Sequence, residues 1–297
     1  MIPRPHCYRP SARPFRRATA ILCLLVFTLW VSPRGYTATL LNISFIDVGE
    51  GDAIFLEVPG HCNFLVDTGN PVSGVKVLSF LVQRGTTHLD HLILTHPHLD
   101  HIGGAFSLIQ LLHVEKVYDN GEDLTSEVKT RDLYRWYQSL VRSRSRYSTL
   151  KVGQTLRCPP LTVKVLWPPR PGVTRDWNTN SLVLRVSFGA FHCLLMGDAN
   201  ITAEKRLLAF HAPLRAQILK AGHHGANDAT SPELLSAVSP EVVIISVNKD
   251  NIRGYPSAQT LKRIQKTRAK ILRTDQNGTI TIRARLDGTY QIFPERP

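Results

Sequence analysis

The sequence predicts an α/β protein in which two mixed β-sheets pack face to face between outer layers of helices. Strand patterns and helix patterns recur twice along the chain, so that each half consists of strands followed by helices. Hydrophobic residues make up 43% of the 297 residues and charged residues 20%, which suffices for a large core and excludes intrinsic disorder. No low-complexity linker divides residues 39–297. We therefore expect one domain with a four-layer αββα architecture.

The strands and helices follow from hydrophobic periodicity. In the first half, apolar runs predict strands at 40–46, 53–58, 63–66 and 92–94, and helical periodicity predicts helices at 73–84, 103–112 and 122–146. In the second half, we expect strands at 161–167, 181–188, 191–196, 217–220 and 242–247, helices at 200–210, 232–238 and 257–267, and a terminal hairpin around Asn277-Gly278.

Residues 1–38 have the composition of an export signal. Residues 1–17 contain arginines and no acid, residues 18–31 are uncharged and apolar, and a short segment ending at Ala38 follows. The apolar run is shorter than the ~20 residues of a membrane-spanning helix. We expect export with cleavage near Ala38, and an uncleaved membrane anchor formed by residues 18–31 is the alternative. Membrane contact is expected only through this segment.

The charge that remains without the signal still favours an anionic partner. Residues 39–297 contain 30 Lys and Arg and 23 Asp and Glu, a net charge of +7 against +13 for the whole chain. Cys62, Cys158 and Cys193 lie in this part and form no C-x-x-C pair or disulfide framework. We expect Cys193, within an apolar strand, to be buried.

Residues 95–104, T-H-P-H-L-D-H-I-G-G, contain the strongest functional signal. They place His96, His98, Asp100 and His101 directly after an apolar strand. Imidazole and carboxylate groups are the ligands that zinc and similar ions prefer. In an extended segment His96 and His98 point the same way, which leaves Asp100 and His101 to face a second ion. A solvated His-rich loop is the alternative, and the preceding strand and the downstream motifs favour the metal site.

Metal-type side chains also follow other predicted strands, namely Asp67, Asn178 or Asn180, Asp198, and His223-His224. A lone carboxylate such as Asp198 can bridge two cations, although it could also cap the helix predicted at 200–210. Two ions would lower the pKa of a water between them and neutralise a developing oxyanion. The expected reaction is hydrolysis of an ester, amide, thioester or phosphodiester.

The pattern H-x-H-x-D-H-x-G-G at residues 96–104 resembles the metallo-β-lactamase fold superfamily. Further motifs resemble the hydrolase domain of ComEC-type DNA-uptake proteins. These motifs are F-I-D-V-G-E-G-D-A-I at 45–54, V-D-T-G at 66–69, N-S-L-V-L at 180–184, L-M-G-D-A at 195–199, L-K-A-G-H-H-G at 219–225 and the segment 246–251. The resemblance covers about residues 40–288. It implies the αββα fold and a nuclease that depends on divalent metal.

The sequence departs from the family pattern at three places. Asn178-Thr179-Asn180 stands where the superfamily has its third-motif His, and an amide oxygen is a weaker ligand. Tyr255 replaces the His of G-H-P-S, and Glu50 replaces a Gln. The long membrane channel that accompanies this domain in competence proteins is missing, so we do not expect this chain itself to transport DNA.

The motifs together predict the following site. His96 and His98 hold one ion with Asn178 or Asn180, Asp100, His101 and His223 hold the other, and Asp198 bridges the two. Asp67 orients a ligand imidazole from behind. Asp100, Asp198 and His224 are expected to act in catalysis, with His224 facing the substrate, and Lys220, Lys249 and Tyr255 are expected to bind substrate. The Arg142, Arg144 and Arg146 run either follows a phosphate backbone or, more commonly for such runs, forms a solvated helix end.

These expectations define an exported hydrolase with two zinc or manganese ions that acts on the phosphodiester bonds of DNA, without a nucleotide cofactor. One alternative keeps the fold and changes the substrate to small esters, lactones or β-lactams. Another is a DNA-binding module that has lost most of its turnover through Tyr255 and the Asn ligand. A basic groove would favour the nuclease, and a narrow apolar pocket would favour the hydrolase of small molecules. Binding without cleavage would favour the DNA-binding module.

Overall fold

The computed structural model describes Met1, residues 39–125 and residues 131–297. The expected export signal and part of the helix predicted at 122–146 therefore lie outside the described residues. Ala38–Pro297 forms one unit. Among the described helices, none combines the length and the apolar composition that crossing a bilayer requires.

The first sheet has eight strands in the order β15-β14-β1-β2-β3-β4-β5-β6. They are β1 (Leu40–Phe45), β2 (Ile54–Val58), β3 (Cys62–Val66), β4 (His88–Ile93), β5 (His113–Asp119), β6 (Arg146–Thr149), β14 (Ile280–Arg285) and β15 (Tyr290–Pro294). Strands β3 to β6 pair in parallel, and the others pair antiparallel. The C-terminal hairpin thus completes the N-terminal sheet.

The second sheet has seven strands in the order β13-β12-β11-β10-β9-β8-β7. They are β7 (Thr155–Cys158), β8 (Leu161–Trp167), β9 (Val183–Phe188), β10 (Phe191–Leu195), β11 (Ile218–Lys220), β12 (Val242–Ile245) and β13 (Lys270–Arg273). Strands β10 to β13 pair in parallel. Each sheet therefore has a parallel half whose strands end at a common edge.

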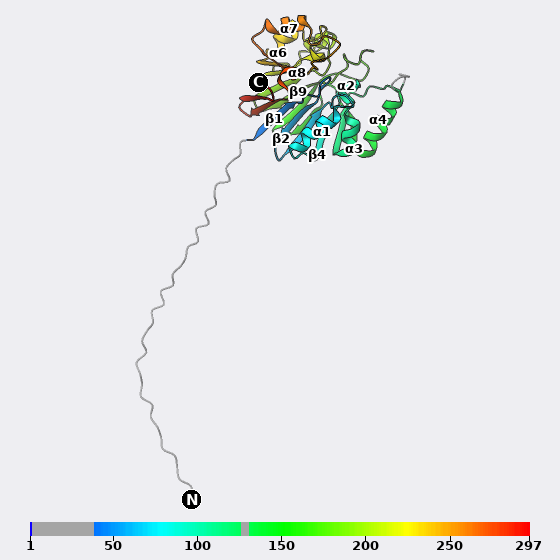
Figure 1. The fold of residues 1–297 in the computed structure, drawn as a ribbon, viewed down its shortest axis with the longest axis vertical. Coiled ribbons are helices and arrows are strands. Elements are labelled where there is room, and N and C mark those ends of the chain that lie inside the picture. Colours follow the sequence, from blue (N-terminus) through cyan, green and yellow to red (C-terminus); the bar gives the residue numbers. More distant parts are fainter. Residues whose placement is uncertain (2–38, 126–130) are drawn as a thin grey trace, which may run out of the picture. The chain divides into compact units, whose positions relative to one another are not determined.

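Helices cover the outer face of each sheet (Figure 1). On the first sheet lie α1 (Gly74–Gln83), α2 (Leu99–Ile102), α3 (Ala105–Leu111) and α4 (Arg131–Arg144). On the second lie α5 (Ile201–Ala209), α6 (Pro232–Val238) and α7 (Ala258–Gln265), and the chain also forms the short helices η1 (Gly222–Gly225) and α8 (Thr274–Asn277). The four-layer αββα prediction is confirmed.

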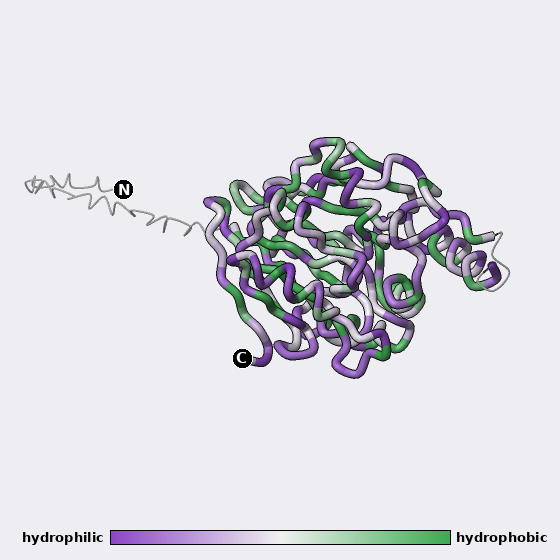
Figure 2. The backbone as a smooth tube through the Cα atoms, turned by 90° about the horizontal axis from the view of Figure 1, so that it is seen from above, coloured by the Kyte–Doolittle hydropathy of each residue, from purple (hydrophilic) through white to green (hydrophobic). Residues whose placement is uncertain are grey.

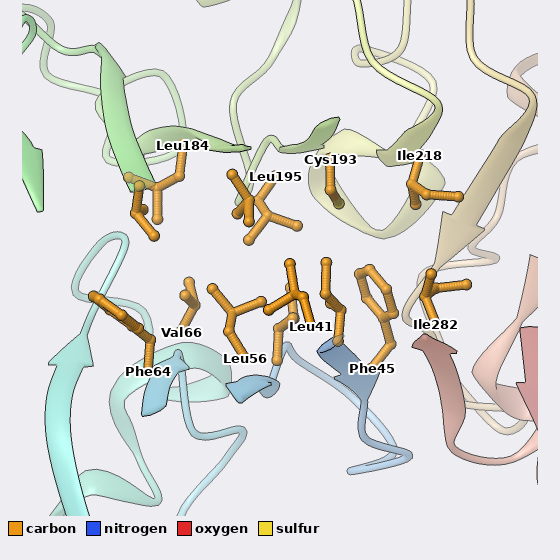
Figure 3. Close-up of a cluster of buried hydrophobic side chains, with 14 of the residues drawn as sticks. Leu41, Phe45, Leu56, Phe64, Val66, Leu184, Cys193, Leu195, Ile218 and Ile282 are labelled. Atoms are coloured by element: carbon orange, nitrogen blue, oxygen red, sulfur yellow. The ribbon is translucent and has the colours of Figure 1, made fainter. Parts of the chain in front are cut away.

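The main core lies between the two sheets. Figure 3 shows Leu41, Phe45 and Leu56 of the first sheet facing Leu195 and Cys193 of the second, and all five are buried. Figure 2 shows apolar residues concentrated in the central strands and polar residues along peripheral loops. The burial of Cys193, as predicted, leaves it as a free thiol within the core.

Several strands were missed by the sequence analysis, and one predicted turn is wrong. Strands β5, β6, β7 and β13 were not predicted, because they are short or carry several charged side chains that hide the apolar alternation. Asn277-Gly278 does not form the hairpin turn; it ends α8, and the turn between β14 and β15 lies at residues 286–289. Arg142 and Arg144 lie at the end of α4, and Arg146 begins β6. The exposed Arg142 lies 4.6 Å above the Tyr147 ring and Arg146 pairs with Glu115, so the interpretation of the run as solvated is favoured.

A disulfide joins the two sheets. Cys62 begins β3 and Cys158 ends β7, and the two residues are 96 positions apart in the sequence. The interpretation that found no disulfide framework is wrong at this point, because pairing depends on which strands the fold brings together and spacing does not reveal it. The bridge restrains the two sheets relative to each other.

Candidate metal centre

Polar side chains from both sheets meet where the parallel strands end. Asp67 follows β3, His96 closely follows β4, Asp198 closely follows β10, and His223 and His224 lie in η1 after β11. The carboxyl ends of parallel strands share one edge of a sheet, and here both sheets bring those edges to the same place. A loop-based site on a rigid scaffold results.

Asp198 lies at the centre of this group. Its carboxylate is 1% exposed, and its Oδ1 atom lies 3.2 Å from His101 Nε2 and 3.3 Å from His224 Nε2. Its Oδ2 atom points to the other side, 3.7 Å from His96 Nε2 and 4.0 Å from His223 Nε2. Each oxygen thus faces a different set of imidazoles, which is the arrangement expected of a carboxylate that bridges two cations.

The donor atoms form two groups that overlap at Asp198, one with His96 and His98 and the other with Asp100, His101 and His224. His96 Nε2 lies 2.9 Å from His98 Nδ1, and His101 Nε2 lies 3.3 Å from His224 Nε2. Asp198 Oδ1 is buried without a hydrogen-bond partner among the described residues. Nitrogen lone pairs and unpaired carboxylate oxygens that converge in this way fit two divalent cations.

The histidines are held in the orientation that a metal ligand needs. Four rings place Nδ1 next to an oxygen atom, which leaves Nε2 for the centre. The pairs are His96 with Thr95 Oγ1 at 3.0 Å, His101 with Asp67 Oδ2 at 2.8 Å, His223 with Asp228 Oδ1 at 3.1 Å, and His224 with the Ser246 carbonyl at 2.9 Å. His98 is the exception and turns its Nδ1 inward.

Asp67 occupies the position expected for it behind a ligand imidazole. It is fully buried and accepts hydrogen bonds from the backbone N–H of Thr95 at 2.7 Å and from the Thr95 hydroxyl at 2.8 Å. The remaining interaction is with His101 Nδ1. The carboxylate thereby fixes the ring in the tautomer whose Nε2 is free to bind a cation.

The two adjacent histidines occupy places different from those expected. His224 is 2% exposed and lies within the group of Asp100, His101 and Asp198, whereas His223 is 12% exposed and lies beside Asn178. Both have left-handed backbone conformations, with φ of 45° and 52°, which send the rings in different directions. The geometry favours His224 rather than His223 as the ligand of the second ion.

The side chains of Asn178 and Asn180 also have different partners. The Asn178 amide lies 3.2 Å from His223 Nε2, and its Oδ1 is buried without a hydrogen-bond partner in the described structure. Asn180 donates to Glu122 at 2.6 Å and to the Thr174 carbonyl at 2.9 Å. Its amide is thus occupied in holding neighbouring loops, which leaves Asn178 as the candidate at the first metal position.

Lys220 does not lie where a substrate contact requires. Its side chain is fully buried, with Nζ 2.5 Å from Asp52 Oδ2 and 3.1 Å from the Gly197 carbonyl. Asp52 in turn lies 4.0 Å from His101 Nδ1 and 4.0 Å from His224 Nδ1. The substrate-binding expectation for Lys220 is therefore corrected to a positioning role, since the ammonium group is directed into the protein beneath the histidines.

Protonation in the site follows from burial and charge. Burial raises the pKa of Asp198, but the nearby His101 and His224 outweigh it and hold this pKa well below its usual range. Burial lowers the pKa of His96 and of His98, so both rings are neutral at neutral pH and suited to bind metal. For His101 the carboxylates of Asp198 and Asp67 outweigh burial and raise the pKa well above its usual range. Positive charge is thus favoured beside the Asp198 and Asp67 carboxylates.

The rim of the site contains Tyr255, which was predicted there, and two residues that sequence patterns did not reveal, Trp177 and Arg253. The part-exposed Trp177 ring lies 5.3 Å from the His98 ring, and the Tyr255 ring lies 5.4 Å from the His223 ring. Arg253 Nε lies 3.5 Å from Glu50, and its Nη1 lies 3.9 Å from Asp100. Tyr255 was expected at the substrate. No motif singled out Trp177 or Arg253; the only available signal was that each neighbours a motif residue.

Lys249 is exposed on the loop after β12, and its role in substrate binding stays a prediction. Burial raises the pKa of Tyr255 above its ordinary value, with Arg253 opposing the shift. The Tyr255 hydroxyl is therefore protonated at neutral pH and is available as a hydrogen-bond donor.

The chain is similar to known metallo-beta-lactamase proteins. A family model described as the Metallo-beta-lactamase superfamily matches residues 46–247. ComE operon protein 3 of Bacillus subtilis is 32% identical over 92% of this chain and 37% of its own length. Competence protein ComA of Neisseria gonorrhoeae is 26% identical over 89% of this chain and 35% of its own length. The chain thus spans about a third of the length of these relatives.

Among solved structures, the metallo-beta-lactamase fold protein YhfI from Bacillus subtilis superposes with a TM-score of 0.56 and 12% sequence identity. The similarity covers 86% of this chain and all of that one. At this identity the likeness concerns the fold alone, and it agrees with the four-layer sandwich described above.

Proposed function

Since this chain belongs to the metallo-beta-lactamase superfamily, and within it to the family of ComEC-type hydrolase domains, we propose that it is an exported dinuclear-metal phosphodiesterase that cleaves DNA. Family membership makes it a metal-dependent hydrolase related to competence proteins. The observation that carries the finer proposal is the Asp198 carboxylate, whose two oxygens face two separate groups of donor atoms.

In this proposal His96, His98 and Asn178 would hold one ion, Asp100, His101 and His224 would hold the other, and Asp198 would serve both groups. Divalent ions bound there would supply Lewis acidity and make hydroxide available near neutral pH. Zinc suits the imidazoles, and manganese suits the oxygen-rich third position of the first group.

The side chains of this chain perform the remaining tasks. Asp67 and the Ser246 carbonyl hold His101 and His224 in the tautomer that presents Nε2. The protonated Tyr255 hydroxyl is placed to donate a hydrogen bond to a substrate oxygen beside His223. Burial of the central carboxylate excludes water from it, which strengthens its interaction with cations.

DNA as the substrate is supported by three features. A relative that covers this domain is named a competence protein. The part of the chain after residue 38 carries a net charge of +7. The rim carries a guanidinium group and aromatic rings, which suit a phosphate and bases, rather than a purely apolar lining for small esters.

Export is supported by the composition of residues 1–38 and by the disulfide between Cys62 and Cys158. Disulfides form and persist in oxidising compartments such as the periplasm or the extracellular space, and they are rare in the cytosol. Two alternatives remain for the apolar run at residues 18–31: it is removed with a cleaved signal, or it stays and anchors the protein in the membrane.

The test is cleavage of single- and double-stranded DNA by the purified protein with added manganese or zinc. Asp100→Ala removes a proposed ligand, and Asp132→Ala serves as its control because Asp132 is 86% exposed on α4. Cleavage by the parent and by the control, and loss of at least a hundredfold in Asp100→Ala, supports the proposal. Binding without cleavage favours the DNA-binding module, and cleavage of esters or lactams alone favours the small-molecule hydrolase.

A further inference from the structure

We propose that Arg253 and Trp177 form a recognition subsite for a single nucleic-acid strand on the rim of the metal centre, in which Arg253 contacts a phosphate and Trp177 stacks on an unpaired base. The inference deepens the proposed nuclease function and rests on it. It assigns the specificity of the site to two residues outside the metal-ligand set.

Arg253 lies at the mouth of the site. Its side chain is 49% exposed, and it extends from the loop after β12 to Glu50 and to Asp100 of the second donor group. A guanidinium group beside a proposed metal ligand can present planar donors to a phosphate, and its half-exposed position leaves it open to water. With Lys220 buried against Asp52, Arg253 provides the positive charge that Lys220 was expected to provide.

The Arg253 loop is held by hydrogen bonds of Asn251. Its side-chain amide donates to the carbonyls of Asn248 and Tyr255, each at 2.7 Å, and accepts from the Tyr255 backbone N–H at 2.7 Å. The loop therefore presents Arg253 and Tyr255 together. Pre-organisation of this kind reduces the conformational entropy lost when a substrate binds.

Glu50 gains a role from this arrangement. Its carboxylate contacts Arg253 Nε at 3.5 Å, and both side chains are part-exposed. Glu50 stands where the related motif has Gln, a change that would place an unbalanced negative charge near a polyanionic substrate. The contact with Arg253 offsets part of this charge and holds the guanidinium group beside Asp100 of the metal centre.

Trp177 lies beside His98 of the first donor group. Its ring lies 5.3 Å from His98, at an interplanar angle of 58°, and remains part-exposed. Its loop is fixed by Asp176, which accepts hydrogen bonds from Asn178 N at 3.2 Å, the Thr179 hydroxyl at 2.7 Å and Asn200 Nδ2 at 2.7 Å. An indole on a loop fixed in this way, beside a proposed metal ligand, is a platform for a planar group.

Arg253 and Trp177 together would favour single-stranded over double-stranded nucleic acid. A base paired and stacked within a duplex cannot offer its face to a side chain, whereas an unpaired base can stack on an aromatic ring, and stacking contributes about 1 to 3 kcal/mol per base. A phosphate on the strand would then reach Arg253 across the donor atoms. We therefore expect single-stranded or frayed DNA to bind more tightly than an intact duplex.

The experiment measures equilibrium binding of phosphorothioate-linked dT12, with manganese present, by fluorescence anisotropy. Trp177→Ala and Arg253→Ala should each weaken binding about tenfold or more, and Arg253→Ala should reduce the salt dependence by about one phosphate contact. Trp177→Phe and Arg253→Lys should retain most of the affinity. Controls are Trp136→Phe, at a half-exposed position on α4, and Arg135→Ala, whose side chain is 64% exposed on α4.

Tryptophan emission adds a readout that a purely structural role would not move. Binding of dT12 should quench the emission of the parent and of Trp136→Phe, and this quenching should be lost in Trp177→Phe although binding persists. Affinity in Trp177→Ala and Arg253→Ala equal to that of the controls, or absence of binding by the parent, overturns the subsite. If these variants cleave DNA normally, the nuclease proposal stands. If the parent protein binds dT12 but cleaves no DNA, only the nuclease proposal is refuted.

Discussion

The Nδ1 atom of His101 lies 2.8 Å from Oδ2 of Asp67, and both side chains are buried. Asp67 therefore decides which nitrogen of His101 is free to bind a cation. We predict that Asp67→Asn will weaken metal affinity about 10- to 100-fold, which is the usual effect of removing such a partner. Titration of the metal-free protein with zinc against a competing chelator measures this. Unchanged affinity in a folded variant would contradict the orienting role.

The buried Lys220–Asp52 pair predicts a large loss of stability when one partner is removed. Lys220→Met leaves the Asp52 carboxylate buried without its cation, which typically costs about 3 to 5 kcal/mol. The double variant with Asp52→Asn should recover much of that loss, because no buried charge remains unpaired. Urea denaturation in the presence of a chelator measures the free energy of unfolding without the contribution of metal. Equal losses in the single and double variants would argue against the pair.

The bridge between Cys62 and Cys158 predicts that reductant destabilises the protein. Replacing both residues by Ser should lower the free energy of unfolding by about 2 to 5 kcal/mol, mainly because the unfolded chain gains freedom over a long loop. The double variant should then be insensitive to dithiothreitol, whereas Cys193→Ala should remain sensitive. Thermal unfolding with and without reductant tests both. A parent protein that reductant leaves unchanged would be incompatible with this prediction.

The lowered pKa of the partly buried His91 predicts that the folded protein loses stability in acid. It stacks on Phe64 with ring centroids 4.2 Å apart, and burial, with Lys116, lowers its pKa to about 4. In the unfolded chain His91 binds a proton below its ordinary pKa of 6.5, whereas in the folded chain it stays neutral down to about pH 4, so stability falls as the pH drops from about 6.5 to about 4. His91→Phe keeps the stacking and removes the proton. Urea denaturation at pH 7 and pH 4.5 should show a smaller drop for the variant, and parallel drops would refute the assignment.

The sequence revealed the parts of the site that follow apolar strands. Asp67, His96 and Asp198 each come after a run of hydrophobic residues, so their convergence at one edge could be expected from the sheet architecture alone. The same reasoning predicted the four layers. It did not place the C-terminal hairpin in the first sheet, because strand order across a sandwich depends on long-range pairing.

Other parts depend on local backbone geometry or on distant neighbours. The choice between His223 and His224 follows from two consecutive left-handed residues, which no residue pattern in η1 predicts. Lys220 was expected to bind substrate because it lies beside a motif, and only the fold shows that it is buried and pairs with Asp52. Trp177 and Arg253 lie on loops whose positions are set by the hydrogen bonds of Asp176 and Asn251.

The most direct test of the account is a titration of the metal-free protein with manganese or zinc while bound metal and DNA cleavage are measured together. The account predicts that cleavage saturates at two metal ions per chain, and that Asp198→Ala loses both the second equivalent and the activity. Full cleavage at a single equivalent, or cleavage that survives in Asp198→Ala, would contradict the two-metal centre on which the proposed function depends.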